Sequence, residues 1–411
     1  MPATASAPLR APRGGRHRPR GLVRVRTLGA ITLLLAHVLA LAGGALPTGG
    51  DPDQVSISGI SSGAAMAVQF AVAHSKTVRG VAEIAGPGWG CAQGRISQAV
   101  NACLCARDPL PSRVDQARSL AKQGLIDHLH DDKPQGLSRA FVFHSMGDAT
   151  VLAPSGQASV SFLTDFIGAA PIVDWGNGQD DSDHAGHGFI APTGGDACRT
   201  DGHEQTYVRH CGGEDNARDL FKALYPDVPT TPADRVADIP DADLRPFDQQ
   251  PYIDAVKGKG AYIAPDDLAF YFWPTRSERR QNLDMAATGY VYVPPSCRVA
   301  DAHCRVHIAL HGCKQDARVF AQQAGYDNWA EHYRVIVVYP ALQPSGSPVS
   351  EACSAGEVST WLDSAWAKPN PNGCWDWWGY LDGGDNTRYL TKAAPQMQVL
   401  ERIITALTRQ P

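Results

Sequence analysis

The sequence predicts an α/β fold, in which a mostly parallel sheet is covered by helices on both faces. Short strand-like segments alternate with helical segments through most of the chain, which is typical of parallel strands joined by crossover helices. Of the 411 residues, 43% are hydrophobic and 19% are charged, so the chain can bury a large core. The 40 glycines and 30 prolines predict many turns between the elements.

In the first half, the apolar patterns give a regular order of elements. We expect strands at 55–58, 81–85, 140–145 and 171–175, and helices at 62–74, 111–123 and 157–167. Residues 177–188, rich in Gly, Asp and His, are expected to form a loop.

The second half is predicted to complete the same sheet. Strands are expected at 289–293, 306–310 and 335–339, followed by a helix at 386–407 with apolar residues every three or four positions. Pro395 would kink this helix or mark its true start. Residues 226–286, rich in Pro, Asp and Arg, interrupt the alternation and are predicted to be a long connector or insertion within one domain, 46–411.

The N-terminal segment predicts export. Seven arginines between Arg10 and Arg26 precede an apolar run at 28–42 and small residues up to Ala45, which is the pattern of a signal peptide spanning 1–45. The alternative is a membrane anchor, but the run is shorter than the roughly 20 residues that cross a bilayer and His37 interrupts it. The mature protein is therefore expected to be secreted, to the periplasm or the medium, without stable membrane insertion.

The cysteines and charges narrow the classes of partner. A formal net charge of −5 disfavours nucleic acid. Ten cysteines, all beyond the signal, predict disulfides, and spacing favours Cys297–Cys304, Cys198–Cys211, and Cys91 with Cys103 or Cys105. Their spacing is poor for zinc, and the histidines and aspartates at 128–132 fit a solvated turn better than a cation site. We expect no metal and no cofactor.

Ser61 is the candidate nucleophile. It lies in Gly59-Ile60-Ser61-Ser62-Gly63, a Gly-x-Ser-x-Gly pattern between a predicted strand and a predicted amphipathic helix. The pattern alone is often an ordinary loop, but strand, sharp turn and helix are the context that a nucleophile elbow requires.

The partners that a serine needs follow it along the chain. A base must take the hydroxyl proton, and a carboxylate must orient that base. Asp148 follows a predicted strand, and His187 lies in a loop, so the order Ser, Asp, His is that of α/β-hydrolases. Taken singly, Asp148 could cap a turn and His187 could be a solvated loop residue, with His184 as a rival; with the elbow, we favour Asp148 and His187.

An ester-cleaving site also needs hydrogen-bond donors for the oxyanion. The backbone N–H of Ser62 is one, and the strand 306–310 runs into a His-Gly turn like the oxyanion loop of lipases. That loop normally precedes the elbow. Here it follows, which implies a circular permutation in which residues 287–408 supply the elements that normally come first; a plain buried strand with a tight turn is the alternative.

At these residues the chain resembles the extracellular polyhydroxybutyrate depolymerases with a circularly permuted catalytic domain. The likeness covers nearly all of the mature chain in two blocks. The motifs that carry it are 56–63, 66–70, 85–87 and 147–151, together with 289–294, Leu310-His311-Gly312-Cys313-Lys314-Gln315, 325–330 and Asn372-Gly373-Cys374-Trp375-Asp376-Trp377-Trp378-Gly379-Tyr380.

The resemblance implies roles for particular residues. Ser61, Asp148 and His187 would form the triad, the N–H groups of Ser62 and Cys313 the oxyanion hole, and Cys313 would be bridged to Cys374. Trp375 would then reach the cleft, where its indole could pack on the methyl groups of a polyester; the alternative is that these tryptophans belong to the core.

The chain also departs from the family pattern. Gly63-Ala64-Ala65 stands where the family often has Gly-Gly-Tyr, the loop after His187 is longer than usual, and 258–280 looks like an insertion. No separate substrate-binding domain is visible after the catalytic part. We therefore expect a serine esterase acting on poly(3-hydroxybutyrate) or its oligomers. The alternatives are a secreted carboxylesterase for other esters, such as a feruloyl-esterase-like enzyme, and a non-catalytic polymer-binding protein. Oligomeric state and the pairing of Cys353 stay open.

Overall fold

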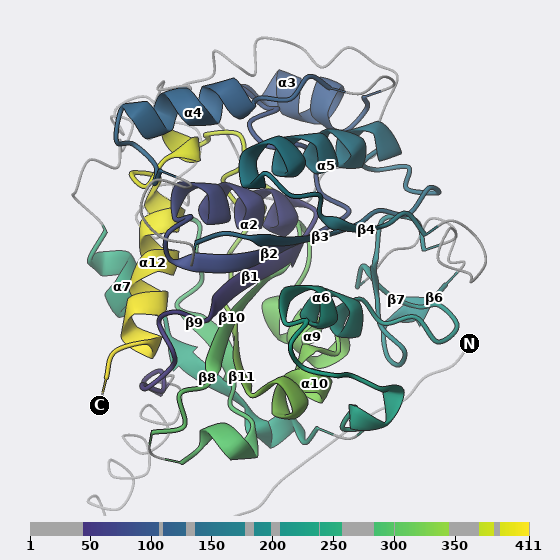
Figure 1. Cartoon of the computed structure of the whole chain (residues 1–411), viewed down its shortest axis with the longest axis vertical. Coiled ribbons are helices and arrows are strands. Elements are labelled where there is room, and N and C mark those ends of the chain that lie inside the picture. Colours follow the sequence, from purple (N-terminus) through teal and green to yellow (C-terminus); the bar gives the residue numbers. More distant parts are fainter. Residues whose placement is uncertain are drawn as a thin grey trace, which may run out of the picture. The chain divides into compact units, whose positions relative to one another are not determined.

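An eight-stranded sheet forms the centre of the part of the chain that the structure describes (Figure 1). Its strand order is β4 (Ile172–Asp174), β3 (Arg139–Phe143), β2 (Val78–Ile84), β1 (Val55–Ile60), β10 (Arg305–Leu310), β11 (Val335–Tyr339), β9 (Thr288–Tyr292) and β8 (Leu244–Asp248). The first six are parallel, and β9 and β8 pair antiparallel. The predicted mostly parallel α/β fold is confirmed.

The computed structural model describes residues 44–106, 110–128, 136–176, 185–198, 206–237, 239–256, 283–299, 301–344, 370–381 and 387–410. All of them belong to one unit, Gly43–Pro411. The predicted signal peptide, except for its last two residues, and His184, Cys353 and 258–280 lie outside these ranges.

Helices cover both faces of the sheet (Figure 1). On one face, α2 (Ser62–Ala73), α4 (Val114–Lys122), α5 (Ala153–Ile167) and α12 (Pro395–Leu407) share a core with β1 and β10; on the other, α6 (Asn216–Leu224), α9 (Ala317–Gln323) and α10 (Tyr326–Tyr333) pack around Phe221, Tyr326 and Trp329. The central strands β1 and β11 are buried on both faces; β11 is therefore a continuous apolar run, whereas β1 carries two buried serines.

The remaining elements are short. They are α3 (Ile96–Gln98), a π-turn at Ala99–Cys103, α7 (Gln250–Asp254), 3₁₀ turns at Pro232–Asp234, Asp241–Asp243, Pro295–Cys297 and Arg388–Leu390, and a small sheet of β5 (Phe189–Ile190), β7 (Val208–His210) and β6 (Asp196–Ala197). The small sheet follows His187 directly, so it fixes the base of the loop that carries this histidine.

Two of the differences between the predicted and the observed elements have clear reasons. The C-terminal helix begins at Pro395, because proline is tolerated in the first turn of a helix, where its missing N–H is not needed. Strand β8 lies within 226–286 and was missed because Arg245 and Pro246 break the apolar alternation; proline is tolerated there because β8 is at the edge of the sheet.

A chain of buried side chains also joins β1 to β10. His307 Nδ1 lies 2.6 Å from Ser56 Oγ, and its Nε2 lies 2.7 Å from Ser58 Oγ. The two serines continue to Tyr225 and Tyr326, at 2.6 and 2.7 Å. Burial lowers the pKa of His307 to about 3, so the ring is neutral and the network holds the two strands without charge.

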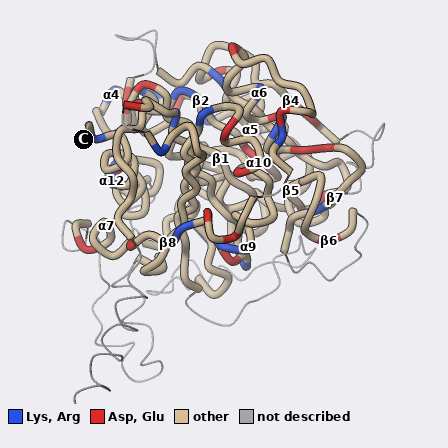
Figure 2. The backbone as a smooth tube through the Cα atoms, turned by 90° about the horizontal axis from the view of Figure 1, so that it is seen from below, with Lys and Arg blue, Asp and Glu red and all other residues tan. Residues whose placement is uncertain are grey.

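The cysteine pairs are those that spacing favoured. Bonds join Cys198 to Cys211, Cys297 to Cys304, and, of the two alternatives for Cys91, Cys91 to Cys103. Cys105 is also disulfide-bonded. Within the described ranges, no helix is long and apolar enough to cross a membrane, and no group of three metal-ligating side chains occurs. Basic and acidic residues are intermingled along the drawn chain (Figure 2).

Candidate active site

Ser61 stands on a strained turn between β1 and α2. Its φ and ψ are 56° and −120°, a conformation that residues with a side chain rarely adopt. Its N–H donates to Ile84 O at 2.9 Å, and its carbonyl accepts from Ala65 N at 3.0 Å, so both sides of the turn are fixed. The side chain is partly exposed at the carboxyl end of the parallel strands.

The glycines on either side of Ser61 are required by close packing. A Cβ at Gly59 would meet the backbone of Gly63 and lie 2.8 Å from Ala64 N, and a Cβ at Gly63 would overlap the carbonyls of Leu310 and His311. The elbow therefore holds the first turn of α2 against both β1 and the end of β10.

Asp148 and His187 form a buried hydrogen-bonded pair. His187 Nδ1 donates to Asp148 Oδ2 at 2.8 Å, and both residues are 4% exposed. The other carboxylate oxygen, Oδ1, accepts from Thr150 N at 2.8 Å and from Val151 N at 2.9 Å. Because Nδ1 carries the proton, Nε2 of His187 is left as the basic nitrogen.

The electrostatics of this pair keep Asp148 ionised. Burial alone would raise the pKa of Asp148, but the charge and hydrogen bond of His187, together with the Val151 N–H, outweigh burial and hold this pKa below its usual value. An ionised carboxylate is what fixes the tautomer of a catalytic histidine.

A second histidine, His144, faces the same carboxylate. Its Nε2 lies 2.8 Å from Val151 O and 3.7 Å from Asp148 Oδ2. Burial lowers the pKa of His144, so the ring is neutral and donates to the Val151 carbonyl. His144 had no predicted role, although its place directly after β3 and four residues before Asp148 can be seen in the sequence.

The turn after β10 lies beside the elbow. A Cβ at Gly312 would lie 3.2 Å from Ser61 Cβ and 3.2 Å from Ile60 O, so the Gly312 backbone touches the nucleophile. The N–H groups of Ser62, at the first position of α2, and of Cys313 have no hydrogen-bond acceptor in the described ranges. These two donors are therefore available for an oxyanion next to Ser61.

Gln315 links this turn to the histidine loop. Its Oε1 accepts from Gly312 N at 2.5 Å, and its Nε2 donates to Thr206 O at 2.6 Å. The next residue, Tyr207, contacts the His187 ring edge-on at 6.0 Å between ring centroids. Gln315 was noted in the sequence as part of a motif without a role, because its partners come from a distant segment.

Trp375 does not lie where the sequence analysis placed it. It is 0% exposed, and its indole N–H donates to His311 O at 3.0 Å, while its backbone N–H lies 3.4 Å from Ser62 Oγ. With no exposed surface, the indole supports the turn after β10 from behind and presents no face to a polymer. The core alternative describes its position.

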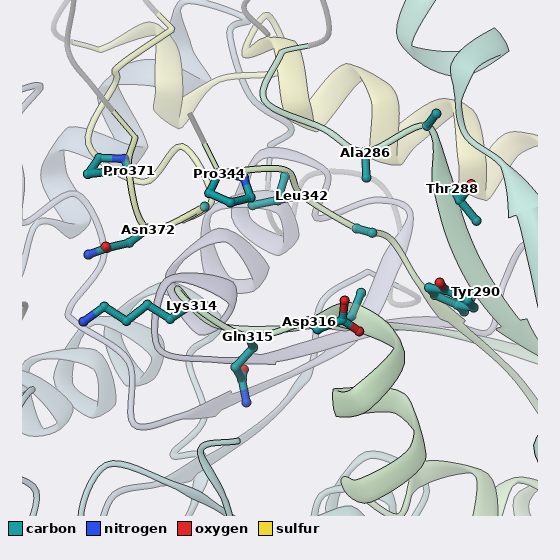
Figure 3. A pocket seen from close by; sticks show the side chains of 14 residues that line it. Ala286, Thr288, Tyr290, Lys314, Gln315, Asp316, Leu342, Pro344, Pro371 and Asn372 are labelled. Carbon is teal, nitrogen blue, oxygen red and sulfur yellow. The ribbon is translucent and has the colours of Figure 1, made fainter. Parts of the chain in front are cut away.

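A disulfide fixes the same turn. Cys313 is bonded to Cys374, and the next residue, Lys314, donates its N–H to Asn372 O at 2.7 Å. A cavity of about 460 Å³ lies alongside; Lys314, Gln315, Asp316 and Tyr290 line one side of it, and Leu342 and Asn372 lie across from them (Figure 3). This volume is in the range of small-molecule sites.

Loss of this disulfide should reduce turnover. In the double variant Cys313→Ala/Cys374→Ala we expect kcat on a soluble aryl ester to fall by about ten- to a hundredfold, because one oxyanion donor becomes mobile and removing such a donor costs up to about 10³. Steady-state kinetics measure this fall in kcat.

The matched control is Cys297→Ala/Cys304→Ala, which opens a bridge at the other end of β10. It should lower the free energy of unfolding but leave kcat within about twofold. Equal kcat in the two double variants would show that the Cys313–Cys374 bridge does not hold the donor.

The strained serine turn, the parallel sheet and the acid and base loops together define an α/β-hydrolase fold. Ordinary members carry the oxyanion strand before the elbow, and here β10 comes after it.

The comparisons name particular relatives. The chain is 28% identical over 362 residues, 86% of its length, to a poly(3-hydroxybutyrate) depolymerase of Delftia acidovorans, and 38% identical over 100 residues to a polyhydroxybutyrate depolymerase of Talaromyces funiculosus. These matches span 59% and 26% of the two relatives. No family model matches the chain.

Two solved structures share the fold. The chain superposes on a polyhydroxybutyrate depolymerase from Penicillium funiculosum with a TM-score of 0.60, and on a PHB depolymerase variant complexed with R3HB trimer with a TM-score of 0.61. In both cases the sequence identity is 23%, and 89% of this chain and 98% of the other are covered. The chain is thus similar to polyhydroxybutyrate depolymerases in sequence and fold.

Proposed function

We propose that this chain is a secreted serine esterase that hydrolyses poly(3-hydroxybutyrate) or its oligomers. The observation that carries the proposal is the buried Asp148–His187 pair, found at the same end of the sheet as a strained serine; beside this serine are two N–H donors with no acceptor among the described residues. The likeness to the Delftia and Talaromyces enzymes supports the substrate, and the disulfides fit an oxidising compartment.

The residues act in two steps. In the first, His187 Nε2 takes the proton of Ser61 Oγ as the oxygen attacks the ester carbonyl, and the N–H groups of Ser62 and Cys313 stabilise the oxyanion. The protonated His187 then gives its proton to the leaving alcohol, which leaves an acyl-enzyme on Ser61.

In the second step, His187 takes a proton from water, which attacks the acyl carbonyl. Collapse of the second oxyanion returns the proton to Ser61 and releases the acid. Asp148 stays ionised throughout and holds Nδ1.

The test is product release from amorphous poly(3-hydroxybutyrate) by the purified protein, with Ser61→Ala as a matched blank. We expect 3-hydroxybutyrate and its oligomers to appear, at a rate at least about a hundred times that of the blank, because the nucleophile is removed in the blank. Liquid chromatography with mass detection measures both.

Two outcomes would contradict the proposal. Cleavage of aryl esters without release of hydroxybutyrate would keep the serine esterase and replace its substrate by another ester. Adsorption to the polymer without cleavage of any ester, and without labelling of Ser61 by a serine-reactive fluorophosphonate, would make the protein a polymer binder.

A further inference from the structure

Glu83 is a buried carboxyl group outside the catalytic triad. It lies on β2 and is 0% exposed. Two positions along the strand from Val81, it faces the same side as that residue, toward α2 and α5. In the described ranges, both of its carboxyl oxygens are without a hydrogen-bond partner, as is Ser159 Oγ on α5. An ionised carboxylate at this position would be cut off from bulk solvent, and the hydroxyl of Ser159 would be the nearby group able to turn toward it.

The side chain of Glu83 packs directly behind the nucleophile elbow. A Cβ at Gly86 would lie 2.8 Å from Glu83 Oε1 and 2.8 Å from Ala64 Cβ, so the carboxyl group and the first turn of α2 rest on the same glycine. The residue after Glu83 is Ile84, whose carbonyl accepts the N–H of Ser61 at 2.9 Å. Any movement of the carboxyl group would therefore reach the backbone of the nucleophile.

We propose that Glu83 is a positioning residue for ester hydrolysis that must keep its proton for the site to turn over. The inference rests on the proposed esterase function and adds to the same site a residue whose protonation controls turnover. Protonated Glu83 touches neither substrate nor triad; it fills the space beside Gly86 as a neutral group.

If Glu83 lost its proton to solvent, turnover would fall for two reasons. A buried anion has a large desolvation cost and would move toward water, which would displace Gly86 and Ile84 and with them the Ser61 turn. It would also place negative charge near the N-terminus of α2, whose positive end faces the oxyanion, and so oppose the charge that develops there.

The acid–base properties of Glu83 agree with this geometry. Burial raises the pKa of Glu83 to about 8, and the nearby Ser159 hydroxyl has a smaller, lowering effect. No charged group contributes to the shift: β1 and α2 carry no ionisable side chain, and those of β2, β3 and α5, namely Arg79, Arg139 and Asp165, do not act on it. The proton is therefore present below pH 8 and is lost as the pH rises through this value.

The test compares the parent with Glu83→Gln, which keeps the shape and cannot ionise. We expect equal kcat on a soluble aryl ester at pH 7, within about twofold, and the same fall toward acid as His187 takes up a proton. Above pH 8 the parent should lose turnover and the variant should not, which gives the variant about a tenfold advantage at pH 9, one unit above the pKa. Rates of Ser61→Ala correct for alkaline hydrolysis of the ester.

An alkaline fall that is the same in both proteins would overturn the proposal. A second measurement compares infrared spectra of the parent and Glu83→Gln, because burial also raises the pKa of Asp327 to about 8. The carbonyl band that is present in the parent and missing from the variant should disappear with the midpoint at which kcat falls. Absence of that band, or midpoints more than one pH unit apart, would also overturn it. Because the reporter is an aryl ester, failure to cleave polyhydroxybutyrate would contradict only the proposed substrate, whereas absence of all esterase activity would contradict both.

Discussion

Ser61→Ala is expected to lower kcat by about 10⁶, with little change in folding, since loss of the nucleophile serine of a triad enzyme removes an effect of this size. Alanine keeps the Cβ that touches Gly312, so the turn should survive. What remains would be catalysis by the oxyanion donors of Ser62 and Cys313. Steady-state kinetics on an aryl ester, with circular dichroism for the fold, measure both effects.

Ser61→Gly provides a control that separates chemistry from strain. It removes the same hydroxyl, so kcat should be as low as in Ser61→Ala. Glycine, however, adopts φ 56° and ψ −120° without penalty. Ser61→Gly should therefore unfold at a higher temperature than Ser61→Ala, because roughly 1–3 kcal/mol of backbone strain is released. Retention of more than a hundredth of the parent kcat in either variant would exclude Ser61 as the nucleophile.

Asp148→Asn should lower kcat by about 10⁴. Oδ1 of Asp148 is held by the N–H groups of Thr150 and Val151, at 2.8 and 2.9 Å, so asparagine must place its own oxygen there. Its NH₂ group then points at His187 Nδ1. That nitrogen would have to accept, the proton would move to Nε2, and His187 could no longer take the proton of Ser61.

The matched control is His144→Gln, which changes the other ring near Asp148 but leaves the Asp148–His187 hydrogen bond in place. Its kcat should stay within about tenfold of the parent. The kinetics of both variants, measured between pH 6 and 9, decide the roles. If His144→Gln loses as much activity as Asp148→Asn, then His144 acts in the triad and the assignment of His187 is wrong.

Much of this fold could be predicted from local patterns in the sequence. β11 is a continuous apolar run, β1 and β10 carry Val and Ile in short strand-like segments, and α2 follows a glycine-flanked serine, so their positions and the mostly parallel sheet could be predicted. β8 could not, because Arg245 and Pro246 hide an edge strand whose pairing with β9 is decided by tertiary structure.

For the site, sequence order was enough to name candidates, and the structure brings Asp148 and His187 into contact. The contacts that support the site could not be predicted from the sequence order. Gln315 reaches Thr206, and Trp375 reaches the carbonyl of His311, across 109 and 64 residues. Exposure of a tryptophan cannot be told from its type, since indoles serve both cores and binding surfaces. That is why Trp375 was placed in the cleft although it is buried.

The pairing of β1 with β10 has a consequence for biosynthesis. Ser56 and Val306 are neighbours in the sheet but are separated by 250 positions. A growing chain that has not yet reached Leu310 therefore lacks one neighbour of the strand before Ser61, and it lacks the turn that carries Cys313, the proposed second oxyanion donor. Contacts this distant form slowly. With the function proposed above, incomplete chains should be inert toward esters until the segment that begins with β10 has joined the first half of the sheet.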